Sequence, residues 1–529
     1  MTASQVSGHL SSAHGLAATP PLPGGPVSPR ANTPPLVVAE QLFDALHDAG
    51  VPYCHWKSNE HVAAGMRGLT DLDLLVDRRQ AMQAQAILMR IGFKRFTPAA
   101  GMGYPAIEDY ITLDATTGRL LHCHVHYRLV AGEAHLKGYR LPWEDAFLEH
   151  RQWDAAAQLY VADPNLELLA LLARFVTKLG PLDVARHLLG RRLVADGCLH
   201  EYPWLRERID VERCTSFARE LLGEQVARTL RTLLAAPPAL GPVLRFRRAA
   251  RPQLDLLRSH GPVRGTLLRW LRILPWLVAG VNRRMLRSAY PLRRTVPTGG
   301  VLIAFLGADG SGKSSQARAV AALLAAKLDV LLVYFGSGDG PSSLVRWPLR
   351  LARATAQRLG LLGHHPAGDR TATTRPGGPV LAAVALLWSL ALAIEKRRKL
   401  RAAWRARNLG MVVLTDRYPQ AQIAGFNDGP LLAHWADHPS GWRRRLARWE
   451  AEPYRWAERY QPDVVIKLNV GPETALARKP DTGRFEVERR VTAIRALTYR
   501  PQSVVVDVDA DRPFTEVNRE VTRIIWSHI

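Results

Sequence analysis

Apolar positions in the C-terminal part of the chain fall into short continuous runs separated by helical patterns. The run that opens Val301–Ser315, and the segments Met411–Tyr418 and Pro462–Val470, predict strands that are buried on both faces. Apolar residues at helical spacing lie between them, at Gln316–Lys327 and Val380–Asn408. Strands and helices in alternation predict an α/β fold, with a parallel sheet and helices on both of its faces.

The N-terminal part has a different order of patterns. Helical spacing at Leu36–Gly50 and Gln80–Ile91 alternates with strand patterns that contain Asp71–Val76 and Leu120–Val130, which predicts an α+β domain. Apolar residues then recur every three or four positions from Asn165 to Leu234, as in packed helices.

Composition divides the chain further. The first residues are rich in Pro, Gly, Ser and Ala without an apolar core, which predicts a disordered tail and no secretory signal. Pro341–Gly378 resembles an insertion of helix and polar loop. The expected units are a tail (1–35), the α+β domain (36–160), its helical extension (161–240), a basic linker (241–298) and the α/β domain (299–529).

The clearest chemical motif lies between the first α/β strand and its helix. Gly307-Ala-Asp-Gly-Ser-Gly-Lys313-Ser314 matches G-x-x-x-x-G-K-[ST], the P-loop, whose backbone N–H groups surround phosphates. Lys313 then reaches the β- and γ-phosphates, and Ser314 can ligate Mg²⁺, so ATP and Mg²⁺ are the expected cofactors. The expected nucleotide-binding residues are Gly307, Asp309, Gly310, Ser311, Gly312, Lys313, Ser314 and Ser315.

Further motifs follow in the same half. GADGSGKSSQ, TDRY, LNVGPETALARK and the GRFE of Gly483–Glu486 occur in this order, and the half from Val301 onward resembles the thymidylate kinase family of P-loop nucleoside monophosphate kinases. The resemblance implies a P-loop kinase fold and a catalytic set of Lys313, Asp416, Arg417, Arg478 and Arg484.

The resemblance also implies roles within that set. Asp309 would face the acceptor, Asp416 the metal or the acceptor, and Arg417 the acceptor phosphate. Arg478 and Arg484, which flank the segment KPDTG, would close over the transferring group as lid arginines. The alternatives are a structural ion pair for Arg417 and solvated loop charges for the two lid arginines.

Three positions depart from the family pattern. Leu306 stands where family members have Glu, Phe335-Gly-Ser-Gly-Asp-Gly replaces an Arg-Glu-Pro element, and Pro419-Gln-Ala421 replaces a Ser. The missing Arg normally helps to hold the monophosphate. The resemblance implies dTMP or a related small acceptor, and the missing Arg favours an acceptor other than dTMP.

A second candidate site lies in the N-terminal half. Asp71 and Asp73 share one strand face and suit a divalent cation that also binds triphosphate, and His122, His124 and His126 share a face of a later strand. A solvated strand face for the two aspartates, and exposed or core-satisfied histidines, are the alternatives.

This block resembles the nucleotidyltransferase superfamily through Lys57-Ser58, Gly68-x-x-Asp71-x-Asp73 and the segment His126-Tyr-Arg-Leu. In that superfamily a third acidic residue completes the metal site, and His124 stands at the matching position here. We hypothesise that Asp71, Asp73 and His124 share one site that holds a transition metal in place of Mg²⁺.

Charge and cysteine content add the expected partners and compartment. Lys and Arg number 71 against 47 Asp and Glu, and the net charge of +24 favours polyanionic partners. Arg245–Arg294 has Asp255 as its single acid and mixes Trp, Leu and Arg, which suits an anionic membrane surface, nucleic acid, or a linker helix between domains. Four cysteines without a C-x-x-C pair suit a reducing cytosol. A homodimer is left open.

The apolar run Pro379–Ile394 is shorter than the ~20 residues that span a bilayer, so a buried helix is expected there. The leading functional hypothesis is an ATP- and Mg²⁺-dependent phosphotransferase. The alternatives are a nucleotidyltransferase seated in the N-terminal half, and a nucleotide sensor that docks on anionic membrane or nucleic acid.

Overall fold

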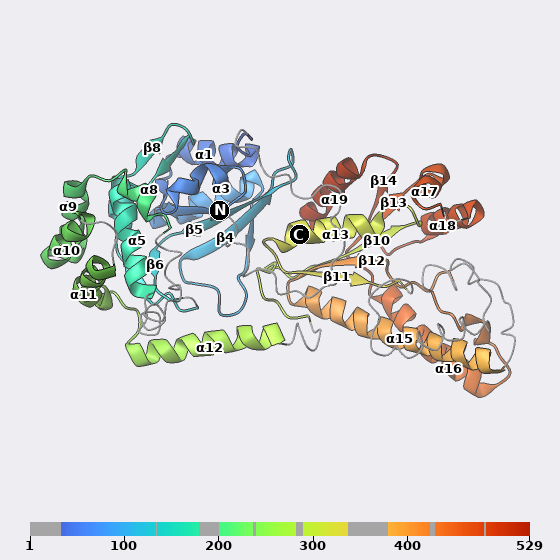
Figure 1. The fold of residues 1–529 in the computed structure, drawn as a ribbon. Helices are drawn as coiled ribbons and strands as arrows, with labels where there is room; N and C mark the ends of the chain where they lie inside the picture. Colours follow the sequence, from blue (N-terminus) through green and yellow to red (C-terminus); the bar gives the residue numbers. More distant parts are fainter. Residues whose placement is uncertain are drawn as a thin grey trace, which may run out of the picture.

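The computed structural model describes residues 33–133, 135–178, 200–235, 240–281, 289–336, 379–423, 429–480 and 483–529. Two large β-sheets with their helices lie side by side, the first formed by the N-terminal half and the second by the C-terminal half (Figure 1). The predicted α/β class is confirmed. Most of the predicted tail, residues 179–199 of the segment with helical spacing and the predicted insertion 341–378 lie outside the described residues.

The C-terminal sheet has five parallel strands. Their order is β11 (Val330–Tyr334), β12 (Val412–Asp416), β10 (Val301–Gly307), β13 (Val464–Asn469) and β14 (Val504–Asp509). Every residue of the central strand β10 is buried, as its unbroken apolar run predicts for a strand covered on both faces. The carboxyl ends of β10 and β12 therefore lie side by side, with Phe305 in register with Asp416.

Helices cover both faces of this sheet (Figure 1). Ile303 and Phe305 pack with Ala317 and Val320 of α13 (Lys313–Ala325), and α19 (Phe514–His528) joins the same core. Residues of the opposite face pack with Ala403 of α15 (Pro379–Asn408). Other helices in the described part of this half are α16 (Gly441–Arg459), α17 (Pro472–Arg478) and α18 (Arg484–Ala496).

The apolar run near the start of α15 confirms the expected helix. Ala391, Leu392 and Ala393 are buried, whereas Leu387 is exposed. Among the described residues, no helix is both long and apolar enough to cross a membrane.

The N-terminal sheet is mixed and has seven strands. Their order is β3 (Lys94–Phe96), β4 (Ile107–Leu113), β5 (Leu120–His126), β2 (Leu72–Val76), β1 (Tyr53–His55), β9 (Leu159–Val161) and β8 (Gln152–Asp154). Strand β5 lies parallel to β2 and antiparallel to β4, so His124 is in register with Asp73 on one side and Asp109 on the other. Helices α1 (Val37–Asp48) and α3 (Ala81–Ile91) pack on this sheet.

Among the described residues, the helices that extend this half are α5 (Pro164–Lys178), α8 (Tyr202–Arg206), α9 (Val211–Leu222), α10 (Glu224–Ala235) and α11 (Leu240–Leu256). Helices α9 and α10 are separated by Gly223, whose φ of +91° a glycine adopts without strain. Asp210 caps α9 by accepting hydrogen bonds from the backbone N–H groups of Glu212 and Arg213, at 2.8 and 3.1 Å.

The basic linker contains α12 (Pro262–Val281), which lies along the outside of the N-terminal half (Figure 1). Its arginines hold it there: Arg269 pairs with Glu133, and Arg272 donates to the carbonyl of Gly103. A row of its apolar side chains is exposed, including Val263, Leu267, Trp270, Leu271, Leu274 and Val278. The helix thus packs against the N-terminal half, and both the linker role and the partner of its apolar side chains stay predictions.

The two halves share direct contacts. The N–H groups of Thr97 and Thr295 donate to each other's carbonyls at 2.9 and 2.8 Å. The Phe96 and Trp526 rings lie 6.1 Å apart, and Phe96 belongs to the same apolar core as β10. Ion pairs also link the two halves: Arg294 pairs with Asp109, and Lys327 pairs with Asp71.

Candidate functional site

Glycines shape the loop between β10 and α13. Gly310 and Gly312 have φ values of +85° and +81°, in the left-handed region that disfavours other residues. A Cβ at Gly310 would lie 2.5 Å from the Ala475 carbonyl oxygen, so a side chain has no room there. Below the loop, a Cβ at Gly307 would lie 2.2 Å from the Ser311 hydroxyl. The predicted glycines are thus required by backbone conformation and by close approach.

Lys313 begins α13 and its side chain is buried against the loop. Its ammonium group donates to the Ala308 carbonyl and to Asp309 Oδ1, both at 3.2 Å. Burial, with the nearby Arg417 charge, lowers the pKa of Lys313 below its usual value. A buried cation at the start of a helix is suited to bind phosphate oxygens.

Ser314 and Asp416 form the second element of the site. The Ser314 hydroxyl donates to Asp416 Oδ2, and Asp416 Oδ1 is buried without a hydrogen-bond partner in the described part of the chain. A serine hydroxyl beside a buried carboxylate with a free oxygen is a donor set that fits Mg²⁺. The two predicted Mg²⁺ ligands thus lie together, because the loop that follows β10 is adjacent to the carboxyl end of β12.

Asp309 lies among basic side chains from four places in the chain. Its carboxylate is 3.3 Å from Arg417 Nη2 and 3.9 Å from Lys479 Nζ, and it pairs with Arg490 as well as with Lys313. Burial alone would raise the pKa of Asp309, but the positive charges outweigh it, led by Lys313, and the pKa lies well below its usual value. Asp309 therefore holds several basic groups at one place.

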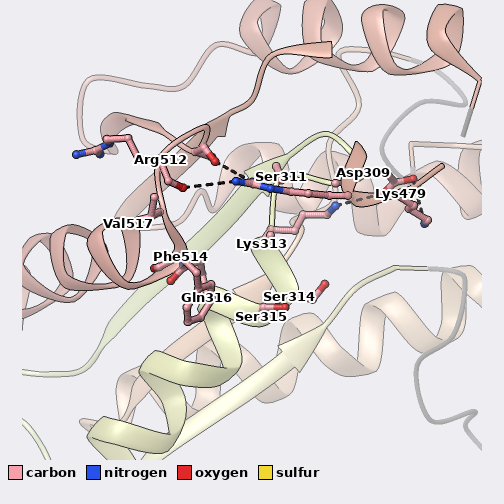
Figure 2. Close-up of a pocket in the computed structure, with 14 residues that line it drawn as sticks. Asp309, Ser311, Lys313, Ser314, Ser315, Gln316, Lys479, Arg512, Phe514 and Val517 are labelled. Carbon is pink, nitrogen blue, oxygen red and sulfur yellow. Dashed lines mark hydrogen bonds and ion pairs between the residues drawn. The ribbon is translucent and has the colours of Figure 1, made fainter. Parts of the chain in front are cut away.

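A pocket of about 590 Å³ opens over the P-loop. Figure 2 shows Asp309 and Lys479 toward one end of it and Arg512, Phe514 and Val517 toward the other. Its volume lies within the usual range of small-molecule sites, about 300–1,000 Å³. The pocket is lined by Asp309, Gly310, Ser311, Gly312, Lys313, Ser314, Ser315, Gln316, Arg478, Lys479, Ala510, Arg512, Phe514 and Val517.

The predicted basic residues differ in their positions. Arg478 lines the pocket and donates to the Ala510 carbonyl at 2.8 Å. Arg417 has a left-handed φ of +70° and does not line the pocket, but it pairs with Asp309, which does.

Arg484 is not among the lining residues. Its side chain is 64% exposed and pairs with Glu473 and Glu488 at 2.9 and 3.0 Å. The structure therefore places it as a solvated charge at the start of α18, and its role as a lid arginine stays a prediction. Two residues of KPDTG, 481 and 482, lie outside the described residues.

Sequence reasoning missed Arg490, Lys479 and Arg512. Arg490 follows Glu486 by four residues on α18 and pairs with it at 2.7 Å, a spacing that predicts a helical ion pair but not the contact with Asp309. No sequence signal places Arg512 beside the P-loop, because it follows the last strand and reaches the pocket only through the fold.

The second candidate site gathers the predicted residues and one more. His122 Nδ1 lies 3.0 Å from Asp71 Oδ1, and His124 Nδ1 lies 3.5 Å from Asp73 Oδ1. Asp109 of β4 is the missed residue: its Oδ1 lies 2.9 Å from His124 Nε2. A carboxylate in a mostly apolar strand pattern was the available signal. The third acidic group thus lies one strand beyond the position that His124 occupies.

Lys57 and Ser58, the other residues of the predicted motif, have different partners. Lys57 Nζ is 2.8 Å from Asp73 Oδ1, whereas the Ser58 hydroxyl donates to Glu201 at 2.7 Å. Ser58 has a left-handed φ of +59°, which turns the chain sharply after Lys57. The part of the motif that contacts the carboxylates is therefore the lysine.

Comparison with known proteins gives relatives but no family model that matches the chain. Over 225 residues the chain is 30% identical to the uncharacterized ATP-binding protein YghS of Escherichia coli K12, covering 42% of this chain and 92% of YghS. Over 231 residues it is 27% identical to the uncharacterized ATP-binding protein YghR of the same strain, covering 42% of this chain and 86% of YghR. By its identity to YghS over nearly all of that protein, the chain belongs to the same family as YghS.

Proposed function

We propose that this protein is an ATP- and Mg²⁺-dependent phosphotransferase that transfers the γ-phosphate of ATP to a small phosphate-bearing acceptor, a nucleoside monophosphate such as dTMP or a related compound. The observation that carries the proposal is the buried Lys313 beside the Ser314–Asp416 pair, at the base of an open pocket. The ATP-binding description of YghS supports the choice of donor.

The P-loop residues bind the donor in this proposal. Loop N–H groups and the Lys313 ammonium group bind the β- and γ-phosphate oxygens, where they stabilise the charge of a loose transition state. Mg²⁺, held by Ser314 and Asp416, supplies further neutralisation of the phosphate charge when bound. The exposed ring of Phe514, with Val517 and Ala510, offers an apolar wall for the purine.

Arg417 and Arg490 position the acceptor. They converge on Asp309, so an acceptor phosphate placed between them would meet two guanidinium groups whose forks match phosphate geometry. An oxygen of that phosphate attacks the γ-phosphorus, the bond to the β–γ bridging oxygen breaks, and ADP leaves with the electron pair. An ionised acceptor oxygen carries no proton, so the step needs no general base.

A product assay tests the proposal. The full-length protein is incubated with ATP, Mg²⁺ and a panel of nucleoside monophosphates, sugars and alcohols, and ADP and pyrophosphate are measured separately. We expect ADP formation that depends on a monophosphate and falls at least a hundredfold in Lys313→Met. Arg318→Ala is the matched control, because Arg318 is an exposed cation on the same helix α13 that does not line the pocket. ADP formation that does not depend on any acceptor, or the absence of nucleotide binding, would refute the proposal.

The metal role is tested by Asp416→Asn. We expect the Mg²⁺ concentration needed for half-maximal activity to rise about tenfold or more, because one charged ligand is lost. ATP affinity measured without metal should change little. An unaltered Mg²⁺ requirement would remove Asp416 from the metal site.

The same assay distinguishes the alternatives. Pyrophosphate that disappears in Asp73→Ala would indicate nucleotidyl transfer in the N-terminal half. Neither product, together with salt-sensitive binding to anionic vesicles or RNA, would indicate a nucleotide sensor.

A further inference from the structure

Helix α12 turns one side toward the N-terminal half and the other toward solvent (Figure 1). Three residues spaced by seven mark the attached side: Gly265 and Ala279 are buried, and Arg272 donates to the carbonyl of Gly103. A Cβ at Gly101 would collide with the Arg272 carbonyl, so the helix backbone passes close to that loop. These contacts fix which side of the helix faces solvent.

The solvent side carries apolar side chains at heptad spacing. We call them the α12 seam: Val263, Leu267, Trp270, Leu274, Leu277 and Val281. Their separations alternate between four and three residues along the whole helix, and each residue is 44–82% exposed. Leu271 and Val278, which are exposed as well, widen the stripe along one edge. In coiled coils, such a repeat keeps one stripe turned toward a second helix.

The seam reads nearly the same from either end. Valine stands at both ends, leucine follows at 267 and 277, and Trp270 and Leu274 lie at the centre. Two copies of α12 that run antiparallel would therefore align valine with valine and leucine with leucine, and each tryptophan would meet a leucine. An interface with two-fold symmetry requires a surface that complements itself in this way.

The charges of α12 do not oppose this pairing. Arg269 and Arg272 are turned to the N-terminal half, where Arg269 pairs with Glu133. Among the positions that flank the seam in α12, Arg264 is the charged one, and it lies near the end of the helix. Like charges therefore do not face each other at the centre of the seam. An anionic bilayer would instead be attracted by basic side chains along the apolar stripe.

The exposed apolar surface is large enough for a stable contact. Together with Leu271 and Val278, the α12 seam offers eight large apolar side chains in each copy. A loss of about 60–70 Å² from each of them, in two copies, reaches the roughly 1,000 Å² that a specific interface buries. Tryptophan alone can bury about 150–250 Å², so Trp270 contributes more than this share.

We propose that the α12 seam is the interface with a second copy of this chain, in which two α12 helices pack antiparallel as a short coiled coil. Burial of the seam removes a row of apolar side chains from water, which is the main driving force of such an association. None of the seam residues lines the pocket over the P-loop, so that pocket stays open in the dimer.

Sedimentation velocity of the full-length protein tests this inference. Over a concentration series that reaches about 50 μM, we expect a species of twice the chain mass of 58.7 kDa, because interfaces of this size have dissociation constants from μM to pM. Leu267→Glu combined with Leu274→Glu should weaken the association on the order of a hundredfold or more, since both carboxylates enter an apolar seam. Met82→Glu combined with Met89→Glu, at exposed positions of α3, is the matched control and should leave the association unaltered.

A mixing experiment covers the case in which a variant folds poorly. In the antiparallel arrangement, position 267 of one copy faces position 277 of the other. Leu267→Glu and Leu277→Lys should each weaken the association when present alone. An equimolar mixture of the two variants should associate more tightly than either of them, because glutamate then faces lysine across the seam. A mixture that associates no better than the single variants overturns the antiparallel arrangement.

Two further outcomes would overturn the inference. One is a dimer that the seam variants and the α3 control variants weaken equally. The other is a chain that stays monomeric at every concentration. If such a monomer binds vesicles of anionic phosphatidylglycerol, and loses that binding in Leu267→Glu combined with Leu274→Glu, the seam faces a bilayer instead. These readouts need no ATP, so they stand or fall separately from the proposed phosphotransfer.

Discussion

The guanidinium group of Arg294 lies 2.9 Å from the carboxylate of Asp109, which joins the segment before the P-loop domain to the first sheet. The Asp109 side chain is 8% exposed, so the pair is largely shielded from water. Burial alone would raise the pKa of Asp109, but hydrogen bonds from His122 and His124 and the charge of Arg294 lower it. The carboxylate is therefore ionised and depends on its partners.

This pair predicts a coupling between the two halves. Arg294→Met leaves Asp109 short of a cation and should lower the free energy of unfolding by about 2–4 kcal/mol. Asp109→Asn with Arg294→Met should recover part of that loss, with a coupling energy of about 0.5–3 kcal/mol. Denaturant unfolding in a chelating buffer gives the four values of the cycle. Strict additivity would show that the pair contributes nothing.

The acceptor site predicts unequal roles for two arginines of α18. Arg490 contacts Asp309, whereas Arg484 pairs with two glutamates in solvent. On the proposed function, Arg490→Ala should raise the KM for the acceptor about tenfold to a hundredfold, as expected for a lost charged hydrogen bond. Arg484→Ala serves as the matched comparison and should change it less than threefold. Steady-state kinetics with the acceptor varied measures both effects. A larger effect of Arg484→Ala than of Arg490→Ala would indicate that Arg484 binds the acceptor.

The P-loop conformation predicts a position-specific effect of adding a methyl group. Gly310→Ala introduces both a left-handed alanine and a Cβ 2.5 Å from the Ala475 carbonyl oxygen. Gly50→Ala introduces only the backbone strain, since a Cβ there meets nothing within 4 Å. We expect Gly50→Ala to cost about 1 kcal/mol and Gly310→Ala at least twice that, with loss of nucleotide affinity. Equal costs in thermal unfolding would contradict the close approach.

A buried acid in the helical extension predicts a pH effect. Glu167 of α5 accepts hydrogen bonds from the Asn59 backbone N–H at 3.0 Å and from its side-chain amide at 2.7 Å. Burial raises the pKa of Glu167 from 4.5 to about 8, against the lowering effect of these hydrogen bonds. The folded protein therefore retains a proton that the unfolded chain releases near pH 4.5, and stability from this group falls as the pH rises from about 4.5 to about 8.

Glu167→Gln removes that titration. The free energy of unfolding of the variant minus that of the unaltered protein should increase by about 2 kcal/mol or more between pH 5 and pH 8. This change is independent of any constant loss from the altered hydrogen bonds. Glu40→Gln, at an exposed position of α1, is the control and should show no such trend. A difference that stays flat across this range would refute the raised pKa.

Helices and strands whose patterns are local could be predicted from the order of residues. The apolar run before Gly307 predicts a buried strand, and the spacing from Gly307 to Lys313 predicts a phosphate-binding turn, because both patterns depend on residues adjacent in the chain. The alternation of strands and helices after Val301 likewise predicts the parallel sheet that the structure has.

Tertiary structure alone decided which distant side chains meet. Arg490 and Asp309 are far apart in sequence, and so are Lys327 and Asp71, so no local period could pair them. Asp109 joined the second site because β5 lies between β4 and β2, a strand order that the apolar pattern does not encode. Local patterns fix an element and its faces, whereas the contacts between elements arise from packing and charge pairing across the whole chain.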